Sequence, residues 1–311
     1  MDAKRARLRV AFQGEPGAFS EAAAVQLLGD WITTVPCPTF DAAFRAVPEG
    51  RADALLAPVE NSLAGSVVRV YDLLLESSLT IVAETVLPIE HHLIGCPGSS
   101  LAGIRSVSSH PMALAQCEKF FLAHPGLKRV PAEDTAGSVR EVLARGDKTA
   151  AAIAGRRAAE YYRGVILQES IQDNSENFTR FVLLIPAVRN GPAAPVGEVQ
   201  VASGPLTDLM VELRVRQAEL APEHTLKMSL ALRLAHKPGA LLGALEPFSR
   251  HSVNLLKIES RPIHGRPWEY QFFLDVESES PSHLQNALAE TRAATSDLRV
   301  LGLYPAARSL S

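Results

Sequence analysis

The sequence predicts two consecutive domains, the first of the α/β class with a mostly parallel sheet and the second of the α+β class. Three observations carry this prediction. The chain has 311 residues, about twice the usual length of one domain. Between residues 8 and 188, short apolar runs alternate with amphipathic stretches, which is typical of α/β sheets. From residue 226 onward, the predicted elements follow the order βαββαβ.

The strands of the first domain are predicted from short apolar runs, and its helices from apolar residues at helical spacing. The strands are expected at residues 8–12, 54–58, 79–86, 105–108, 150–154, 165–167 and 181–185. The helices are expected at residues 18–28, 41–46, 67–75, 111–122, 136–144 and 155–162. Thr39 and Thr135 precede two of these helices, so both are predicted N-caps.

The second domain has a clear order of elements. Its strands are expected at residues 226–235, 253–260, 270–276 and 298–303, and its helices at residues 239–249 and 283–294. This βαββαβ order predicts a ferredoxin-like sandwich, in which both helices cover one face of an antiparallel sheet. So many proteins share this fold that it indicates little about function.

The segment between the domains differs in composition from both. Six of the 17 residues at 189–205 are Gly or Pro, which predicts a linker. Residues 210–216 then alternate apolar and charged side chains, which predicts a strand with one exposed face. Residues 189–225 are therefore interpreted as a linker or an extra element.

Composition excludes several functional classes. Lys and Arg total 31 against 34 Asp and Glu, for a net charge of −3, so no overall field attracts nucleic acid or an anionic membrane. Cys37, Cys96 and Cys117 are spaced neither as a disulfide framework nor as a zinc site. The sequence has no secretory signal and no apolar run of the ~20 residues that span a bilayer. A cytoplasmic location is predicted, with neither nucleic acid nor membrane as a partner.

Polar clusters follow several predicted strands, at the ends where ligands bind in α/β sheets. The first, residues 13–20, places two glycines before a helix N-terminus, although a plain strand-to-helix turn also explains it. The second places Glu60, Asn61 and Ser62 after a buried strand. Glu60 is either a functional carboxylate or a charge that favours the start of the next helix.

The third cluster is Ser109-His110-Pro111, followed by Gln116. Its structural alternative is that Ser109 caps the helix that Pro111 begins. The two histidines at residues 91–92 are interpreted as structural. Neighbouring strand residues face opposite sides of a sheet, so the two rings are not expected to share one site.

The fourth cluster, residues 177–181, precedes the last strand of the first domain. Its Arg180 can bind a carboxylate through two hydrogen bonds, and Thr179 can donate another. None of the common fingerprints of nucleotide hydrolysis, Rossmann dehydrogenation or zinc chemistry is present in the sequence. The four clusters together indicate a site for a small anionic molecule rich in oxygen.

In this order, the motifs resemble those of the prephenate dehydratase family. The resemblance is carried by residues 59–66, 109–111, 134–137 and 177–181, and the C-terminal residues 239–242 and 259–262 resemble the ACT regulatory domain of the same enzymes. It implies a catalytic domain at 1–188, a linker or extra element at 189–225 and an ACT domain at 226–305. The catalytic domain would resemble type II periplasmic binding proteins, with one lobe formed by 8–84 and 168–188 and the other by 85–167.

The resemblance also implies a reaction and roles for individual residues. The family converts prephenate to phenylpyruvate on the route to phenylalanine, with no cofactor and no metal. Thr179, Glu60 and Asn61 are the implied catalytic residues. The implied substrate-binding residues are Ser62, Ser109, Gln116, Thr135, Arg180 and Phe181. Thr179 is expected to form a hydrogen bond to the departing ring oxygen.

Regulation is implied in the same way, with L-phenylalanine as the effector at contacts between ACT domains of a homodimer or homotetramer. The implied effector-binding residues are Gly239, Ala240, Leu241, Leu242, Asn254, Glu259, Ser260, Arg261 and Pro262. Two alternatives stay open. One is an arogenate dehydratase, whose substrate carries an ammonium in place of the keto group, and the other is a non-catalytic sensor of aromatic or amino acids.

Overall fold

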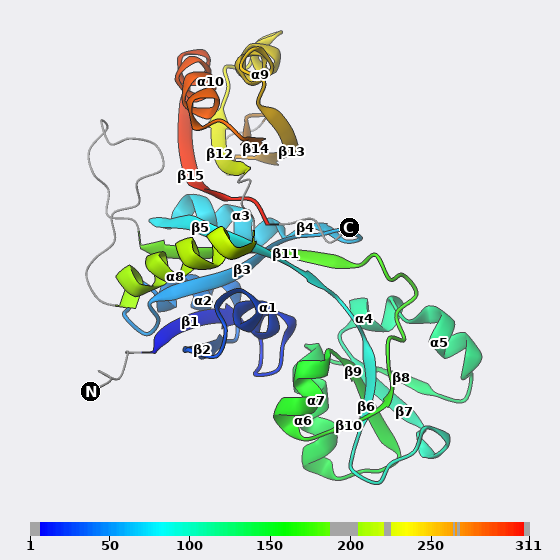
Figure 1. Ribbon diagram of the computed structural model, residues 1–311. Coiled ribbons are helices and arrows are strands. Elements are labelled where there is room, and N and C mark those ends of the chain that lie inside the picture. The colour runs from blue at the N-terminus through cyan, green and yellow to red at the C-terminus, as the bar shows by residue number, and fades with distance from the viewer. Residues whose placement is uncertain (1–6, 187–204, 221–224, 264, 266–267, 308–311) are drawn as a thin grey trace, which may run out of the picture. The chain divides into compact units, whose positions relative to one another are not determined.

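The computed structural model describes residues 7–186, 205–220, 225–263, 265 and 268–307 (Figure 1). The chain forms two compact units, the first containing Met1–Tyr71 and Thr85–Phe181 and the second containing Asp72–Glu84 and Val182–Ser311. The chain passes between them within three elements: α3 (Val68–Glu76), β5 (Leu79–Pro88) and β11 (Phe178–Pro186). The domain boundaries expected from the sequence stay a prediction.

The first unit has two lobes, and the first lobe is built on a parallel sheet. Its strands are β1 (Leu8–Gln13), β2 (Ile32–Cys37) and β3 (Ala54–Asn61), in the order β2-β1-β3, and β4 (Gly65–Ser66) pairs antiparallel with β3. The helices α1 (Phe19–Leu28) and α2 (Phe40–Ala46) pack on this sheet. Thr39 caps α2 by accepting a hydrogen bond from the backbone N–H of Ala42, which confirms that prediction. The edge strand β2, rich in Thr and interrupted by Pro36, was not predicted.

The second lobe has a five-stranded sheet with helices on both faces. The strand order is β10-β6-β9-β7-β8, with β6 (His92–Gly95), β7 (Ser106–Ser109), β8 (Lys128–Pro131), β9 (Ala150–Ala154) and β10 (Val165–Gln168). Successive strand residues face opposite sides, so Ile153 packs with the residues of α4 (Pro111–Ala115) and α5 (Glu118–Ala123). Ala152 packs with those of α6 (Thr135–Arg145) and α7 (Arg156–Tyr162). The two-lobed α/β architecture is therefore confirmed.

Two predictions about the helices of this lobe are wrong in detail. The single helix expected at 111–122 is two helices, α4 and α5, because Gln116 and Cys117 between them are not helical. The N-cap of α6 is Asp134 and not Thr135, since the Asp134 carboxylate accepts a hydrogen bond from the N–H of Gly137 at 2.5 Å. Thr135 is instead the first residue of the helix.

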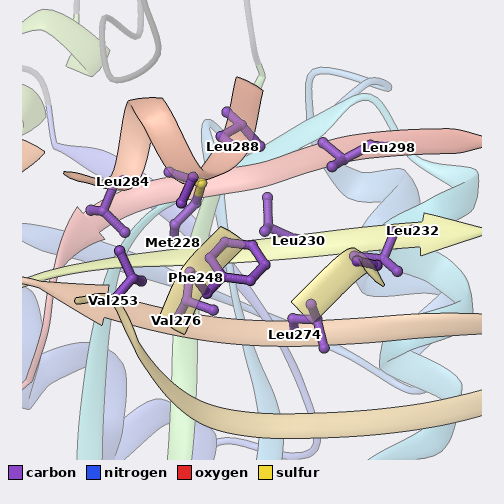
Figure 2. Packing of buried hydrophobic residues seen from close by; sticks show 12 residues of the cluster. Met228, Leu230, Leu232, Phe248, Val253, Leu274, Val276, Leu284, Leu288 and Leu298 are labelled. Carbon is purple, nitrogen blue, oxygen red and sulfur yellow. The ribbon is translucent and has the colours of Figure 1, made fainter. Parts of the chain in front are cut away.

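The second unit contains the predicted βαββαβ order, and its sheet has the order β13-β14-β12-β15. Its elements are β12 (Leu226–Arg233), α9 (Ala240–Arg250), β13 (Asn254–Pro262), β14 (Tyr270–Ser278), α10 (Pro281–Ala294) and β15 (Asp297–Pro305). Figure 2 shows the core, in which Met228, Leu230 and Leu232 of β12 pack among the helix residues Phe248, Leu284 and Leu288. All three side chains of β12 lie on one face because strand side chains alternate.

The predicted strand at 210–216 is wrong, because residues Pro205–Leu220 form the helix α8. Leu209 and Leu213 are both buried, whereas Val211 between them is 56% exposed. Buried side chains four residues apart are typical of a helix. The alternation of apolar and charged residues at 210–216 indicated a strand instead. The linker prediction at 189–205 falls almost wholly outside the described residues.

Candidate active site in the first unit

The end of β3 and the start of β11 bring together the amide of Asn61 and the hydroxyl of Thr179. The Nδ2 atom of Asn61 lies 3.0 Å from Oγ1 of Thr179, 2.7 Å from Oδ1 of Asn177 and 3.1 Å from the backbone carbonyl of Phe178. Thr179 is 8% exposed and Asn177 is 1% exposed. Two of the three implied catalytic residues are therefore in direct contact.

The direction of the Asn61 amide follows from backbone groups. Its Oδ1 accepts hydrogen bonds from the N–H groups of Leu63 and Ala64, at 3.0 and 2.8 Å. A backbone N–H can only donate, so Oδ1 is the acceptor and Nδ2 the donor. Oγ1 of Thr179 therefore accepts from Asn61, and its own hydroxyl proton is free to be donated elsewhere.

Ser62 joins the loop after β3 to the start of β11. Its N–H donates to the carbonyl of Phe178 at 2.8 Å, and its hydroxyl donates to the carbonyl of Glu176 at 2.8 Å. The same hydroxyl accepts from the N–H of Phe178 at 2.9 Å. These bonds fix the loop after β3 against the start of β11. The contacts of Ser62 are therefore those of a residue that positions Asn61 and Thr179.

Glu60 and Arg180, one residue before Asn61 and one after Thr179, form an ion pair. The guanidinium Nε lies 3.7 Å from Oε2 of Glu60, and the side chains of Arg180 and Glu60 are 13% and 38% exposed. An arginine so placed is a strong donor for carboxylates. Phe181, the next residue, is 2% exposed and belongs to the hydrophobic core.

The second lobe contributes Gln116, which follows the break after α4. Its Oε1 lies 3.2 Å from Nδ2 of Asn177 and 2.9 Å from Nε2 of His91. Ser109 is fully buried and donates to the carbonyl of Ile153 at 2.7 Å. The structural alternative for Ser109, a helix cap, is wrong, because His110 is the N-cap of α4.

A pocket of about 280 Å³ lies at the carboxyl ends of β1 and β2. It is lined by Gln13, Gly14, Glu15, Pro36, Cys37, Pro38, Glu133 and Asp134. Glu15 pairs with Arg140 of α6 at 2.6 Å, and Asp134 caps the same helix. The pocket therefore joins the first polar cluster to the N-terminus of α6, where Thr135 lies, and three of its residues are acidic.

Glu21 of α1 ties the two lobes together. This carboxylate is 2% exposed and accepts from the N–H of Gly17 at 2.7 Å, the Thr34 hydroxyl at 2.7 Å and Nε of Arg157 at 3.0 Å. Burial alone would raise the pKa of Glu21, but these donors, led by Arg157, hold that pKa below its usual value. Gly17 has φ +89°, and a Cβ there would come within 2.7 Å of the backbone of Ala158, so this approach requires glycine.

The three cysteines are free and buried. Burial raises the pKa of Cys37, and it raises the pKa of Cys117 to about 12. Neither is therefore a thiolate at neutral pH. Among the described residues, no group of three His, Cys, Asp or Glu side chains is arranged to hold a metal ion.

The predicted effector residues lie in the second unit, around the start of α9 and along β13. Gly239 is the N-cap of α9 with φ +79°, and Leu242 is 72% exposed. Asn254 donates to Glu277 at 3.1 Å, and Arg261 pairs with Asp72 of α3 at 3.4 Å. The remaining predicted positions, Ala240, Leu241, Glu259, Ser260 and Pro262, belong to the same two elements.

Sequence reasoning missed Asn177, His91 and Glu21 as parts of the site. Asn177 stood in a recognised motif but had no assigned role, and the histidines at 91–92 were interpreted only as structural. No local signal identifies Glu21, because its partner Arg157 is 136 positions away in the chain.

Known proteins share sequence similarity with most of this chain. The family model of prephenate dehydratase matches residues 10–187. The chain is 38% identical to arogenate dehydratase/prephenate dehydratase 1 of Arabidopsis thaliana, over 98% of this chain and 74% of that protein.

Two solved structures extend the comparison. The prephenate dehydratase of Arthrobacter aurescens in complex with L-Phe is 31% identical, covering 97% of this chain and 90% of that one, with a TM-score of 0.77. GqqA, described as a novel type of quorum quenching acylase, is 34% identical over 96% of this chain and 98% of that one, with a TM-score of 0.79. On the family match and these identities, the chain belongs to the prephenate dehydratase family.

Proposed function

We propose that the protein converts prephenate to phenylpyruvate. In this reaction the bond between the ring and its carboxylate breaks and releases CO2, and the electron pair enters the ring. The carbon–oxygen bond at the opposite ring position breaks as the ring becomes aromatic, and the departing hydroxide takes up one proton to leave as water. The observation that carries the proposal is the hydroxyl of Thr179, held by Asn61 with its proton free.

Aromatisation supplies the driving force, so the site has two tasks: to hold a dianion and to help hydroxide leave. Thr179 donates a hydrogen bond to the departing oxygen while accepting one from Asn61. Threonine is a very weak acid, so this is a hydrogen bond to developing charge and not a complete proton transfer from the side chain. Such positioned donors contribute about 10²–10⁴-fold to rate, and fixed dipoles contribute about as much.

The anionic substrate needs donors at both carboxylates. Arg180 supplies a guanidinium next to Thr179, and Gln116 supplies amide N–H groups from the second lobe, because its oxygen is already occupied by His91 and Asn177. The N-terminus of α6 adds backbone N–H groups and a favourable dipole. Glu60, paired with Arg180, orients that guanidinium.

Arogenate is the second candidate substrate, and the acidic pocket favours it. Arogenate carries an ammonium where prephenate has a keto group. Glu15, Glu133 and Asp134 line the pocket, and Glu15 and Asp134 are already bonded to Arg140 and Gly137. Glu133 is exposed and is thus the carboxylate best placed to meet an ammonium. The Arabidopsis relative is named for both activities.

The deciding experiment is to supply the purified chain with prephenate and with arogenate and to follow phenylpyruvate and phenylalanine. Formation of phenylpyruvate from prephenate would support the proposal. If only arogenate is converted, to phenylalanine, the proposed reaction stands and the substrate is arogenate. Glu133→Gln is expected to lower kcat/KM for arogenate more than for prephenate. Unchanged relative activities of that variant would remove Glu133 from substrate choice.

Two outcomes would overturn the dehydratase proposal. Binding of either acid without turnover would favour a sensor. Cleavage of an acyl group from a substrate would favour an acylase, which is how GqqA is described. Such cleavage usually needs an activated nucleophile, and the raised pKa values of Cys37 and Cys117 do not supply one.

We also propose that L-phenylalanine inhibits the enzyme by binding at contacts between ACT domains, formed by 226–305, in a homodimer or homotetramer. The Arthrobacter aurescens protein was solved with L-Phe. Support in this chain comes from β13, an edge strand with Leu255, Leu256 and Ile258 36%, 45% and 43% exposed. An exposed apolar edge strand is a ready site for pairing with a second copy.

The proposed location is the cytoplasm. No helix within the described ranges is long and apolar enough to cross a membrane.

A further inference from the structure

His91 lies at one end of a chain of hydrogen bonds that leads to Thr179. The imidazole is 2% exposed and stands just before β6 in the second lobe. From its Nε2 the chain runs to Oε1 of Gln116 at 2.9 Å, and from there to Nδ2 of Asn177 at 3.2 Å. It continues through Oδ1 of Asn177 to Nδ2 of Asn61 at 2.7 Å and ends at Oγ1 of Thr179 at 3.0 Å.

Every direction in this chain follows from the backbone. The N–H groups after Asn61 make its Oδ1 an acceptor, so Nδ2 of Asn61 donates to Asn177. Oδ1 of Asn177 is therefore the acceptor and its Nδ2 the donor to Gln116. The Gln116 atom that faces both Asn177 and His91 must be its oxygen, and Nε2 of His91 must carry the proton.

The opposite tautomer is incompatible with the rest of the chain. An unprotonated Nε2 would require the amide nitrogen of Gln116 to face His91. That nitrogen would also face Nδ2 of Asn177, and turning Asn177 over would set two donors against each other at Asn61. The Nε2-protonated tautomer of His91 is therefore the one that fits this network.

We propose that His91 is a positioning residue of the active site, whose Nε2–H group holds the oxygen of Gln116 and thereby keeps Asn177 and Asn61 oriented toward Thr179. This inference rests on the proposed dehydratase function. With its oxygen fixed by two donors, Gln116 turns its amide nitrogen to the substrate, where it can donate to an anionic oxygen.

The surroundings of Nδ1, the second ring nitrogen of His91, distinguish this positioning role from a purely structural role. Among the described residues Nδ1 of His91 has no hydrogen-bond partner, which is costly for a buried polar atom. In the neighbouring His92, Nδ1 accepts from the N–H of Ser170 at 3.1 Å, as expected of a structural histidine. Burial lowers the pKa of His91, so the ring is neutral and Nδ1 is an unprotonated acceptor. A residue needed only for packing would be apolar.

The activity test compares two variants of the full chain. In His91→Leu the packing volume is kept and the donor is lost, whereas in His91→Gln an amide N–H can reach the position of Nε2. We expect kcat/KM to fall at least about tenfold in His91→Leu and to recover to within about threefold of wild type in His91→Gln. Thermal unfolding is expected to be similar in both. Wild-type activity in His91→Leu, or no recovery in His91→Gln despite a wild-type melting temperature, would overturn the proposal.

A second measurement does not depend on turnover and stays informative if His91→Leu fails to fold. In the ¹⁵N NMR spectrum of the wild-type chain, His91 is expected to show a protonated Nε2 and an unprotonated Nδ1 at neutral pH, assigned by comparison with His91→Gln. His124 is the internal control, because its Nδ1 lies 2.8 Å from the carbonyl of Phe120 and must be the protonated nitrogen.

The two measurements separate the possible failures. A protonated Nδ1 in His91 would overturn the inference and leave the proposed function untouched. Absence of dehydratase activity in the wild-type chain, with the expected tautomer present, would overturn the proposed function and the catalytic purpose of the network.

Discussion

Nδ2 of Asn61 and Oγ1 of Thr179 lie 3.0 Å apart, although 118 positions separate the two residues in the chain. Because the other end of the Asn61 amide is held by two backbone N–H groups, the bond has one direction. Thr179 accepts from Asn61 and retains its own proton for a ligand. This polarity lets a weakly acidic hydroxyl act at a departing oxygen, and it underlies the first two predictions.

Thr179→Ala should lower turnover at least about tenfold, because the departing oxygen loses its donor. Thr179→Ser keeps the hydroxyl and should retain most of the activity. The measurement is kcat for prephenate, with circular dichroism as a check that both variants fold. Wild-type turnover in the alanine variant would remove Thr179 from the mechanism.

Asn61→Asp tests the direction of the bond. The carboxylate still accepts from Leu63 and Ala64, but it places an acceptor oxygen against the oxygens of Thr179 and Asn177. We expect kcat to fall about 10²-fold, comparable to the loss of one preorganised donor. Asn174→Asp, an exposed position in the same region, is the matched control and should behave as wild type. Equal activities in the two variants would contradict the assigned polarity.

Glu21 should make stability depend on pH. Its pKa in the folded protein lies below the ordinary value of 4.5, so the folded state favours the ionised form. This contribution is complete above about pH 4.5 and is lost as the pH falls through the lowered folded pKa. Glu21→Gln should lower the free energy of unfolding at pH 7 by about 3 kcal/mol and flatten its dependence on pH below 5. Urea unfolding at pH 7, 5 and 4 measures both effects, and parallel curves for wild type and variant would contradict the assignment.

The ion pair between Arg261 and Asp72 should carry part of the response to L-phenylalanine. Asp72 belongs to α3, which follows β4, and β4 pairs with Glu60 and Asn61. Asp72→Asn is therefore expected to leave uninhibited turnover near wild type and to raise the half-inhibitory concentration of L-phenylalanine at least about fivefold. Glu290→Gln, which removes an exposed pair with Arg250, should leave inhibition unchanged. Identical inhibition curves for Asp72→Asn and wild type would exclude this pair from coupling.

Ile258→Asp should weaken self-association through β13, because it places a charge on an exposed apolar edge strand. Sedimentation velocity at micromolar protein should show a smaller species than wild type. Leu122→Asp, at an apolar residue of the first unit that is 69% exposed, is the control and should keep the wild-type state. A monomeric wild-type protein would contradict both the interface and the effector site that depends on it.

Local pattern was sufficient for most of the elements. The run at 150–154 is β9 with the same ends, and the second unit has the βαββαβ order that its apolar patterns predicted. The prediction failed where local signals are ambiguous, as at α8, or weak, as at the short strand β6 and the edge strand β2. At the N-terminus of α6, Asp134 and Thr135 are both good caps, and only the backbone geometry decides between them.

The sequence by itself determined which residue types stand at the strand ends, and these residue types are the basis for predicting a site for an oxygen-rich anion there. Only the tertiary structure decided their partners. Sheet order places Asn61 beside Thr179, and the contact between the two lobes places Glu21 of α1 beside Arg157 of α7. No periodicity of 2 or 3.6 residues relates either pair. The role of His91 is the clearest case. Its tautomer depends on three side chains from distant segments, those of Gln116, Asn177 and Asn61, whose hydrogen-bond directions are set by two backbone N–H groups after Asn61.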